Sequence, residues 1–383
     1  MLLDAIFSGI SIGSVLLVAA LGLAIVFGLM GVINMAHGEL MMLGAYTTFL
    51  VQNLFKSWGE GAFEIYIFPA LIVAFIVTAI AGVILERGVV RFLYGRPLET
   101  LLATWGVSLI LQQFVRSVNW VLTASLLLFC ALFFGAWAIL GKRANWVAIK
   151  TKALTILLPV SAGISIATGV LLAQSFKLAV TKPWFGAQNV DVTAPRWLRG
   201  GIPLGDFQLP ATRIFIIVLT IACLLGVYWF LNKSLWGLRI RAVTQNRSMS
   251  ACLGIPTNTV DSLTFALGSG LAGVAGCAIA LLGSVGPNTG QNYIVDTFMV
   301  VVVGGVGKLV GSIVAALAIG TASFLIGSGA FIELFNQVPP LKEFFTFFAT
   351  ASMAKVMVFA AIVVFLQVRP GGLFPQKGRT VES

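Results

Sequence analysis

The stretch AIFSGISIGSVLLVAALGLAIVFGL at positions 5–29 decides the fold class, because it is apolar throughout and carries no charge. An α-helix needs about 20 such residues to cross a hydrocarbon core of roughly 30 Å. Comparable runs follow along the chain at 32–52, 65–85, 98–118, 121–141, 153–175, 212–231, 259–283, 293–310, 311–328 and 344–368. The runs do not alternate, and backbone groups in lipid must hydrogen-bond within their own segment. The sequence therefore predicts an all-α integral membrane protein, a polytopic helical bundle of about 11 spans.

The composition agrees with that fold class. Of the 383 residues, 59% are hydrophobic and only 10% are charged, whereas a soluble protein has about 25% charged residues. So little polar surface cannot cover a water-soluble body of this size, which excludes a soluble enzyme, a disordered chain and a nucleic-acid binder. The net charge of +11 is better explained by basic cytoplasmic loops that face anionic lipid.

Basic residues give the predicted spans an orientation. Most Lys and Arg residues fall in a few connections, namely 86–99, 142–152, 232–258, Lys308 and 369–383. Because basic loops remain in the cytoplasm, we expect these segments and the C-terminus on the inner side. An odd number of spans then places the N-terminus outside. This last step depends on 32–52 crossing the membrane, because a re-entrant segment there would reverse it.

Two polar groups interrupt the apolar runs. Asn34, His37 and Glu39 lie close to Gly31 and Gly38, two glycines that would let the helix break there. Polar side chains are costly in hydrocarbon, so we expect these three to face a cavity as part of a substrate pathway. A second group is expected to form a polar mouth at a span end: Asn288, Gln291, Asn292 and Asp296. Alternatively, the first group only fixes helix packing and the second is merely interfacial.

The sequence predicts neither a catalytic group nor a metal site. His37 is the only histidine, so no two-histidine zinc motif or serine triad can be built. The run Gly304-Gly305-Val306-Gly307-Lys308 is not a phosphate loop, because Leu309 stands where Ser or Thr must follow the lysine. We therefore expect no cofactor on this chain, and any ATP with its Mg²⁺ must bind to another subunit.

Small residues recur four positions apart late in the chain. Gly268, Ala272 and Gly276 share one helical face, and Gly307 and Gly311 are expected to share another. Small residues let helix backbones approach closely in lipid, so we interpret both stripes as helix-packing surfaces. The alternative is a helix that slides during gating.

Two connections differ from the rest. The segment 232–258 combines basic residues with a predicted short helix, which Gly254 and Pro256 would end. The segment is either a solvated loop or a docking element for a cytoplasmic partner. The loop 186–211 is rich in proline and contains Trp197, and it is either an ordered external cap or partner surface or an ordinary long loop whose aromatic residues anchor it at the interface.

Several motifs resemble the branched-chain amino acid ABC permease family. They are Asn34-Met35-Ala36-His37-Gly38, Arg96-Pro97-Leu98 with Leu102–Ser108, and Arg241–Asn246 with Ala251-x-x-Gly254-Ile255. The segments 38–48, 283–290 and 300–309 are similar to the first permease subunit of the urea-importing branch. The likeness covers about residues 1–118 and 186–375, within a single permease domain over 1–383. The intervening residues 119–185 depart from the pattern and are interpreted as an inserted two-helix hairpin beside about nine family spans.

The resemblance implies a multi-pass permease of a prokaryotic inner membrane, surrounded by lipid and not itself an enzyme. Its implied partners are a second permease subunit, two cytoplasmic ATPase subunits and an external solute-binding protein, with no nucleic acid. The likeness assigns ATPase coupling to five residues of 232–258: Arg239, Arg241, Gln245, Asn246 and Gly254.

The sequence leaves the solute open between several readings. Urea is expected first, because it is neutral and would suit an uncharged hydrogen-bonding lining. The alternative is a branched-chain amino acid or a short amide, although a zwitterion would require countercharges that the polar residues do not demand. A stand-alone secondary transporter or channel, and a membrane enzyme built around His37 and Glu39, are the remaining alternatives.

Overall fold

The computed structural model describes residues 2–141, 146–175, 182–204, 207–334 and 339–374, and these form two compact units. One unit combines the chain up to Leu109 with the chain from Val190 onward, and the other is Ile110–Asn189. Among the described residues, eight helices are long and apolar enough to cross a membrane: Ala5–Met30, Ile67–Gly88, Pro97–Ser117, Trp120–Gly141, Thr155–Gln174, Ala211–Lys233, Thr257–Leu282 and Leu309–Gly327. The predicted all-α polytopic membrane fold is confirmed.

Every predicted span overlaps a long helix, although the predicted span 344–368 is divided between α16, which ends at Phe348, and α17, which begins at Ala351. The long helices are α1 (Leu2–Met30), α2 (His37–Ser57), α4 (Ile67–Gly88), α5 (Pro97–Ser117), α6 (Trp120–Gly141), α7 (Trp146–Ser175), α9 (Ala211–Lys233), α12 (Thr257–Leu282), α13 (Thr289–Gly304), α14 (Leu309–Gly327) and α17 (Ala351–Val368). Three of them fall outside the group of eight. The helix α2 has the necessary length but is more polar, whereas α13 and the apolar part of α17 are shorter.

Short elements connect the spans. They are α3 (Glu60–Phe63), η1 (Val90–Leu93), α8 (Arg196–Arg199), the antiparallel strands β1 (Gly201–Leu204) and β2 (Phe207–Pro210), α10 (Leu235–Gln245), α11 (Arg247–Cys252), α15 (Ala330–Leu334) and α16 (Pro339–Phe348).

The larger unit is built around α1 and α12, the two most deeply buried spans. Close backbone approach is possible because small residues line α12. A Cβ added to Gly268 would lie 2.6 Å from the Gly22 carbonyl oxygen of α1, and one added to Gly276 would lie 2.9 Å from the Ala45 nitrogen of α2. Ala272, between these two glycines, is fully buried. The predicted stripe therefore lies where α12 meets α1 and α2.

The second predicted stripe is wrong in its geometry. Gly307 does not continue the helix that contains Gly311, because α13 ends at Gly304 and α14 begins at Leu309. The turn between them needs glycine, since Gly305 and Gly307 have φ values of +97° and +77°. Both members of the predicted stripe still lie at close contacts: Gly307 faces Gly28 of α1, and Gly311 faces Gly304.

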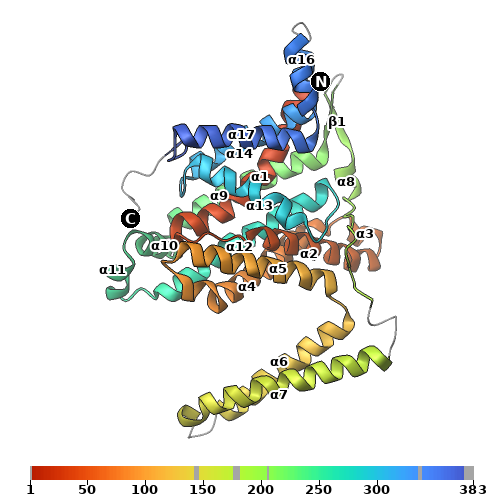
Figure 1. Cartoon of the computed structure of the whole chain (residues 1–383). Helices are drawn as coiled ribbons and strands as arrows, with labels where there is room; N and C mark the ends of the chain where they lie inside the picture. The colour runs from red at the N-terminus through yellow and green to blue at the C-terminus, as the bar shows by residue number, and fades with distance from the viewer. Residues whose placement is uncertain (1, 142–145, 176–181, 205–206, 335–338, 375–383) are drawn as a thin grey trace. The chain divides into compact units, whose positions relative to one another are not determined.

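The connections of the larger unit gather at its two ends (Figure 1). One end carries α10, α11, η1 and the turn before α14, and we call it the α10–α11 end. Contacts between these segments include the Arg247 guanidinium 5.2 Å from the Tyr94 ring centre and the Leu373 N–H donating to the Val303 carbonyl at 2.8 Å. Within the larger unit, the basic connections predicted to be cytoplasmic, namely 86–99, 232–258, Lys308 and the described part of 369–383, lie at this end.

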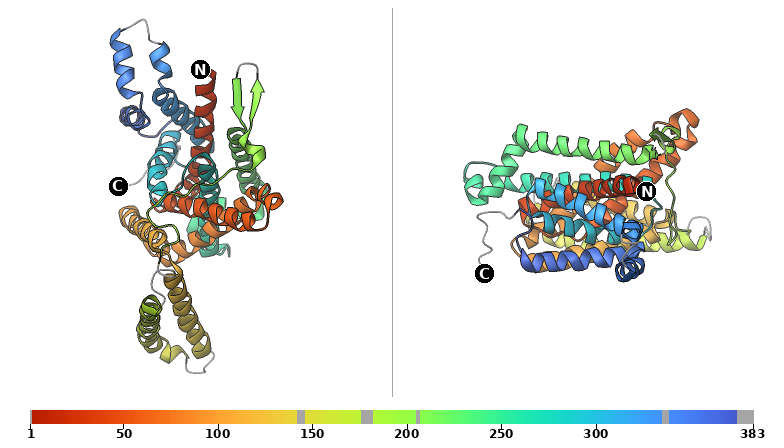
Figure 2. Two further views of the ribbon diagram at one scale, coloured as in Figure 1. Left: turned by 90° about the vertical axis from the view of Figure 1, so that its right-hand side faces the viewer. Right: turned by 90° about the horizontal axis from the view of Figure 1, so that it is seen from above.

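The opposite end carries α3, α8 and the β1–β2 hairpin, and α1 begins close to that hairpin (Figures 1 and 2). We call it the β1–β2 end. The loop 186–211 is fixed there by the Tyr66 hydroxyl, which donates to the Thr193 carbonyl at 2.9 Å. The Trp197 indole donates to the Glu64 carbonyl at 2.8 Å and stacks on Phe68. These contacts hold the described part of the loop 186–211 against the segment 64–68, between α3 and the first turn of α4.

The smaller unit is a helical hairpin of α6 and α7. Its base is closed by the Trp184 N–H, which donates to the Val118 carbonyl at 2.9 Å, and by edge-on contact of the Trp120 and Trp184 rings at 4.9 Å. Large apolar side chains such as Leu127, Phe134 and Ile166 are exposed along both helices, as expected for surfaces in lipid. The predicted insertion 119–185 falls within this unit, while its basic link at Lys142 and Arg143 lies outside the described residues.

Candidate functional site

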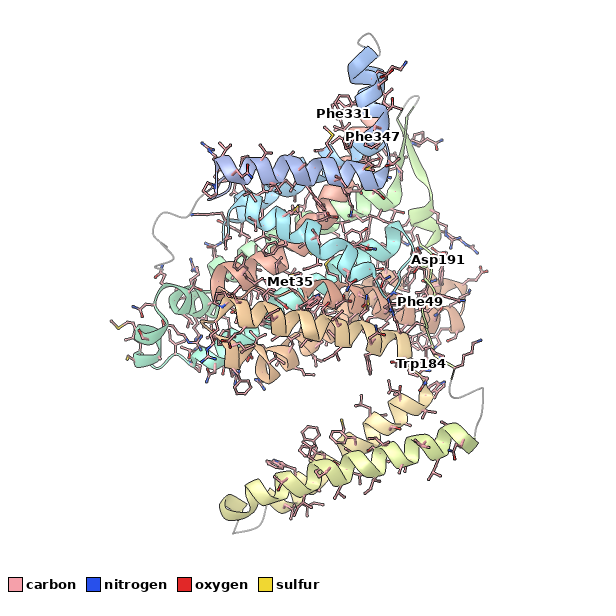
Figure 3. All side chains as sticks on the ribbon, viewed as in Figure 1. Met35, Phe49, Trp184, Asp191, Phe331 and Phe347 are labelled. Atoms are coloured by element: carbon pink, nitrogen blue, oxygen red, sulfur yellow. The ribbon has the colours of Figure 1, made fainter. Side chains whose placement is uncertain are left out.

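The first polar group forms the turn that leads into α2. Gly31 adopts a positive φ of +68°, and the Asn34 side-chain oxygen accepts from the Ala36 N–H at 3.1 Å. The Met35 N–H, at the turn labelled in Figure 3, donates to the Thr104 hydroxyl of α5 at 3.1 Å. This asparagine turn occupies the first residues of the predicted span 32–52, which is why α2 begins only at His37.

His37 is completely buried between α1 and α2. Its Nε2 lies 3.0 Å from the Ala19 carbonyl oxygen, so Nε2 carries the hydrogen and donates. The other ring nitrogen, Nδ1, and the Asn34 side-chain nitrogen have no hydrogen-bond partner among the described residues. Unsatisfied buried polar atoms are unusual in folded proteins.

Glu39 is also buried and links α2 to its neighbours. The Ser108 hydroxyl of α5 donates to the Glu39 carboxylate at 3.1 Å. At the preceding position, a Cβ on Gly38 would lie 2.9 Å from the Gly290 carbonyl carbon of α13. The turn, α5 and the start of α13 therefore meet at one point.

A cavity of about 500 Å³ lies toward the β1–β2 end, and we call it the Asp296 pocket. Six helices line it: α1, α9, α12, α13, α14 and α17. The lining residues are Ile12, Val15, Leu16, Arg213, Leu282, Tyr293, Asp296, Ser323, Phe324, Gly327, Ser328 and Lys355. The lining combines a few charged and polar groups with aliphatic and aromatic side chains. Asn34, His37 and Glu39 do not line it, so the structure separates the predicted pathway residues into two groups.

An ion pair lies in this pocket. The Lys355 ammonium is 2.7 Å from an oxygen of the Asp296 carboxylate, whose side chain is only 9% exposed. The same ammonium lies 3.5 Å from the Asn292 carbonyl oxygen. Asn288, Gln291 and Asn292 are exposed at the start of α13, ahead of Asp296. Of the four residues of the predicted polar mouth, only Asp296 lines the pocket.

Lys355 is not among the pathway residues predicted from the sequence, although it lies within the predicted span 344–368. The available signal was that Asp296 and Lys355 are opposite charges within predicted spans, and such charges usually pair. Arg213, a charged residue at the start of the predicted span 212–231, was also not identified as a pocket residue. Its guanidinium lies 5.7 Å from the Phe324 ring centre, at the edge of the pocket.

The second candidate site is the segment 232–258. It contains two short helices rather than the single one predicted, because Asn246 interrupts it in an extended conformation and caps α11 by accepting from the Met249 N–H at 2.9 Å. Ser234 caps α10 in the same way, accepting from the Gly237 N–H at 2.9 Å. Gly254 ends the segment with a φ of +80°.

The predicted coupling residues occupy the surface of these two helices. Arg241, Gln245 and Asn246 are exposed, and Arg239 lies half-buried with its guanidinium 4.7 Å from the Trp236 ring centre. Exposed apolar side chains lie among them, namely Leu235, Leu238, Met249 and Leu253, and Leu253 is 75% exposed. Basic and apolar groups exposed together are typical of a surface that binds another protein.

A buried polar network connects this surface to the spans. The Arg247 guanidinium of α11 is 2.7 Å from the Asp261 carboxylate of α12. Beside it, the completely buried Glu86 of α4 accepts from the Ser262 hydroxyl at 2.6 Å and from the Tyr94 hydroxyl at 3.1 Å. We call these residues, together with Arg91, the Glu86 network. It ties α11, α12, α4 and the connection before α5 to one another.

The network sets the ionisation of its members outside the spans. Arg91 donates two hydrogen bonds to the Glu86 carboxylate, at 3.1 and 3.2 Å, and these bonds raise the pKa of its guanidinium. Burial, together with the nearby Glu86 charge, raises the pKa of the Tyr94 hydroxyl well above its usual range. Tyr94 is therefore a neutral hydrogen-bond donor at any physiological pH.

Comparison with known proteins identifies relatives over almost the whole chain. The sequence profile of the family described as "Branched-chain amino acid transport system / permease component" matches residues 5–366. The high-affinity branched-chain amino acid transport permease BraD of Pseudomonas aeruginosa is 26% identical over 88% of this chain and 89% of its own length. LivH of Salmonella typhimurium, a permease of the same description, is 25% identical over 97% of this chain and 94% of its own length.

A shorter likeness extends to an archaeon. A probable branched-chain amino acid transport permease, LivH of Methanocaldococcus jannaschii, is 31% identical over 32% of this chain. No solved structure matches significantly. The relatives are transport permease subunits, which are not enzymes, and the apolar helices of this chain are those of a multi-pass inner-membrane protein. With a profile match from residue 5 to residue 366, the chain belongs to the permease component family of branched-chain amino acid ABC transport systems.

Proposed function

We propose that this chain forms half of the translocation pathway of an ATP-driven importer for branched-chain amino acids. Full-length similarity to permeases named for that transport supports the proposal most directly. This replaces urea, the solute expected first from the sequence, with the alternative that was considered beside it. Urea was preferred because no countercharges for a zwitterion were evident, but Asp296, Lys355 and Arg213 all line one pocket.

The importer would require partners that the chain does not supply. A second permease would complete the pathway, two cytoplasmic ATPases would bind ATP and Mg²⁺, and an external solute-binding protein would deliver the solute. The exposed basic and apolar surface of α10 and α11 would hold the ATPases, with the C-terminus also in the cytoplasm. The N-terminus and the β1–β2 end would then face outward, toward the binding protein.

The Glu86 network suggests how ATPase movement would reach the pathway. A push on α11 would pass through the Arg247–Asp261 ion pair into α12, the buried span that contacts α1, α2 and α4. The small residues of α12 would let its neighbours shift without a large change in packing. The Asn34–His37 turn and the Asp296 pocket would alternate in their access to the two sides.

Uptake by the purified complex tests this function. The tagged chain would be isolated from its native membrane with its bound subunits and reconstituted into proteoliposomes together with the binding protein. We expect internal ATP to drive accumulation of radiolabelled leucine, and a hydrolysis-deficient ATPase to abolish it. Accumulation of urea or a short amide but not leucine would favour the other solutes. Uptake that persists without the ATPases would indicate a stand-alone carrier or channel.

A further inference from the structure

The Asp296 pocket combines features that together specify a class of ligand. It has a carboxylate, an ammonium and a guanidinium, contributed by Asp296, Lys355 and Arg213. Its volume of about 500 Å³ falls within the range of small-molecule sites, roughly 300–1,000 Å³. Resting on the proposed function, we propose that this pocket is a binding site for zwitterionic α-amino acids with aliphatic side chains.

The charges favour a zwitterion over other small solutes. A lone anion would meet the buried Asp296 carboxylate, and a lone cation would meet both Lys355 and Arg213. A neutral solute such as urea could hydrogen-bond to these three groups but could form an ion pair with none of them. A zwitterion satisfies both signs, because its ammonium can approach Asp296 while its carboxylate approaches Lys355 and Arg213.

The Asp296–Lys355 ion pair can open so that the ammonium of a ligand takes the place of the lysine. Lys355 and Asp296 are in direct contact at 2.7 Å, yet 43% of the Lys355 side chain is exposed while Asp296 is nearly enclosed. The lysine can therefore swing away from the aspartate while its charge remains solvated. The ligand's own ammonium would replace it at Asp296, so no buried charge is left alone.

The apolar wall accounts for the aliphatic side chain. Ile12, Val15 and Leu16 present one face of α1, and Leu282 and Phe324 lie near the ends of α12 and α14. A branched aliphatic group against these side chains would remove apolar surface from water on both partners. The pocket also lies toward the β1–β2 end, where α9 and α17 begin and where α12 and α14 end.

Neutralising the charges one at a time and together gives the decisive test. The complete complex would be compared as wild type, Asp296→Asn, Lys355→Met and the double variant, with Glu99→Gln of the exposed Arg96–Glu99 pair as a control. We expect each single variant to lower kcat/KM for leucine uptake at least about tenfold, as expected for loss of one charged hydrogen bond. The double variant is expected to remain impaired.

A purely structural ion pair predicts the opposite for the double variant. Replacing both members of such a pair by neutral groups is often harmless, because no unpaired charge remains. Recovery of uptake in the double variant would therefore overturn the binding site. Normal uptake in both single variants would overturn it as well.

A binding measurement separates this inference from the proposed function. Ser328→Cys places a thiol at the pocket edge, and its rate of maleimide labelling in the purified complex reports occupancy. We expect leucine to slow labelling more than 4-methylpentanoate or 3-methylbutylamine, which each lack one charge, and urea to have no effect. Protection by leucine in a complex that does not transport it would leave the site standing while the proposed function fails. Leucine transport without protection would overturn the site alone.

Discussion

The buried Glu86 carboxylate gives the sharpest quantitative prediction. It is completely buried and accepts hydrogen bonds from Ser262, from Tyr94 and, twice, from Arg91, at distances of 2.6 to 3.2 Å. In Glu86→Gln only one oxygen remains, and the new amide group directs its hydrogens at groups that are themselves donors. About half of the hydrogen bonds to this side chain are therefore lost.

The expected size follows from those contacts. Loss of one partner from a buried ion pair costs about 3–5 kcal/mol, but the Arg91 side chain is 30% exposed and water compensates for part of the loss. We therefore expect Glu86→Gln to lower the free energy of unfolding by about 2–3 kcal/mol. Removing both charges, as Glu86→Gln with Arg91→Gln, is expected to recover part of that loss.

Unfolding in mixed micelles, followed by tryptophan fluorescence, measures the stability, and the reconstituted complex measures coupling. In Glu86→Gln we expect ATP hydrolysis to continue while ATP-driven uptake falls, because α11, α12 and α4 no longer move together. The exposed Glu99→Gln serves as the matched control, with a change within about 0.5 kcal/mol. If Glu86→Gln is as stable as that control and transports normally, the Glu86 network neither stabilises the chain nor couples it.

Three further predictions concern helix packing, docking and the turn before α2. Gly276→Val is expected to destabilise the chain by about 1–3 kcal/mol in the same unfolding assay, because the added Cβ would clash with the backbone of α2. The control Gly226→Val, at a helix position with open space, should be tolerated. Leu253→Asp is expected to reduce co-purification of the ATPases while solute capture by the binding protein is unchanged, and a full complement of bound ATPase would refute the docking surface. His37→Ala is expected to impair uptake more than membrane insertion, measured by transport and by the amount of chain in the membrane, and normal uptake would limit His37 to packing.

The spans could be predicted because their signal is local. A helix in lipid needs only sufficient apolar length, and eight of the described helices have it. The boundaries were harder where polar geometry intervenes. The Asn34 turn delays the start of α2, and positive φ at Gly305 and Gly307 separates α13 from α14 within one apolar stretch. The polar residues and Gly31 predicted a break before α2, but the residue at which each helix begins or ends depends on backbone geometry that hydropathy does not report.

The candidate sites were only partly predictable, because their pairs are distant in sequence. Asp296 was predicted to be a pathway residue, but its ion-pair partner Lys355 lies 59 residues away on another span. Glu86 and Asp261 stand at the ends of apolar runs, where a charge usually faces water, and only the fold shows that both are buried. Charges within or beside predicted spans are therefore best considered in pairs of opposite sign.

The location of α11 relative to the membrane tests the central claim most directly, because the whole account depends on cytoplasmic ATPases reaching this helix. Cys252 is exposed on α11, whereas Cys130, Cys223 and Cys277 are partly or fully buried in helices of the apolar runs. Intact cells would be treated with a membrane-impermeant maleimide, and the labelled peptides would be identified by mass spectrometry before and after permeabilisation. We predict that Cys252 reacts only after permeabilisation, and more slowly when the ATPases are bound. Labelling of Cys252 in intact cells would place α11 outside and contradict the account.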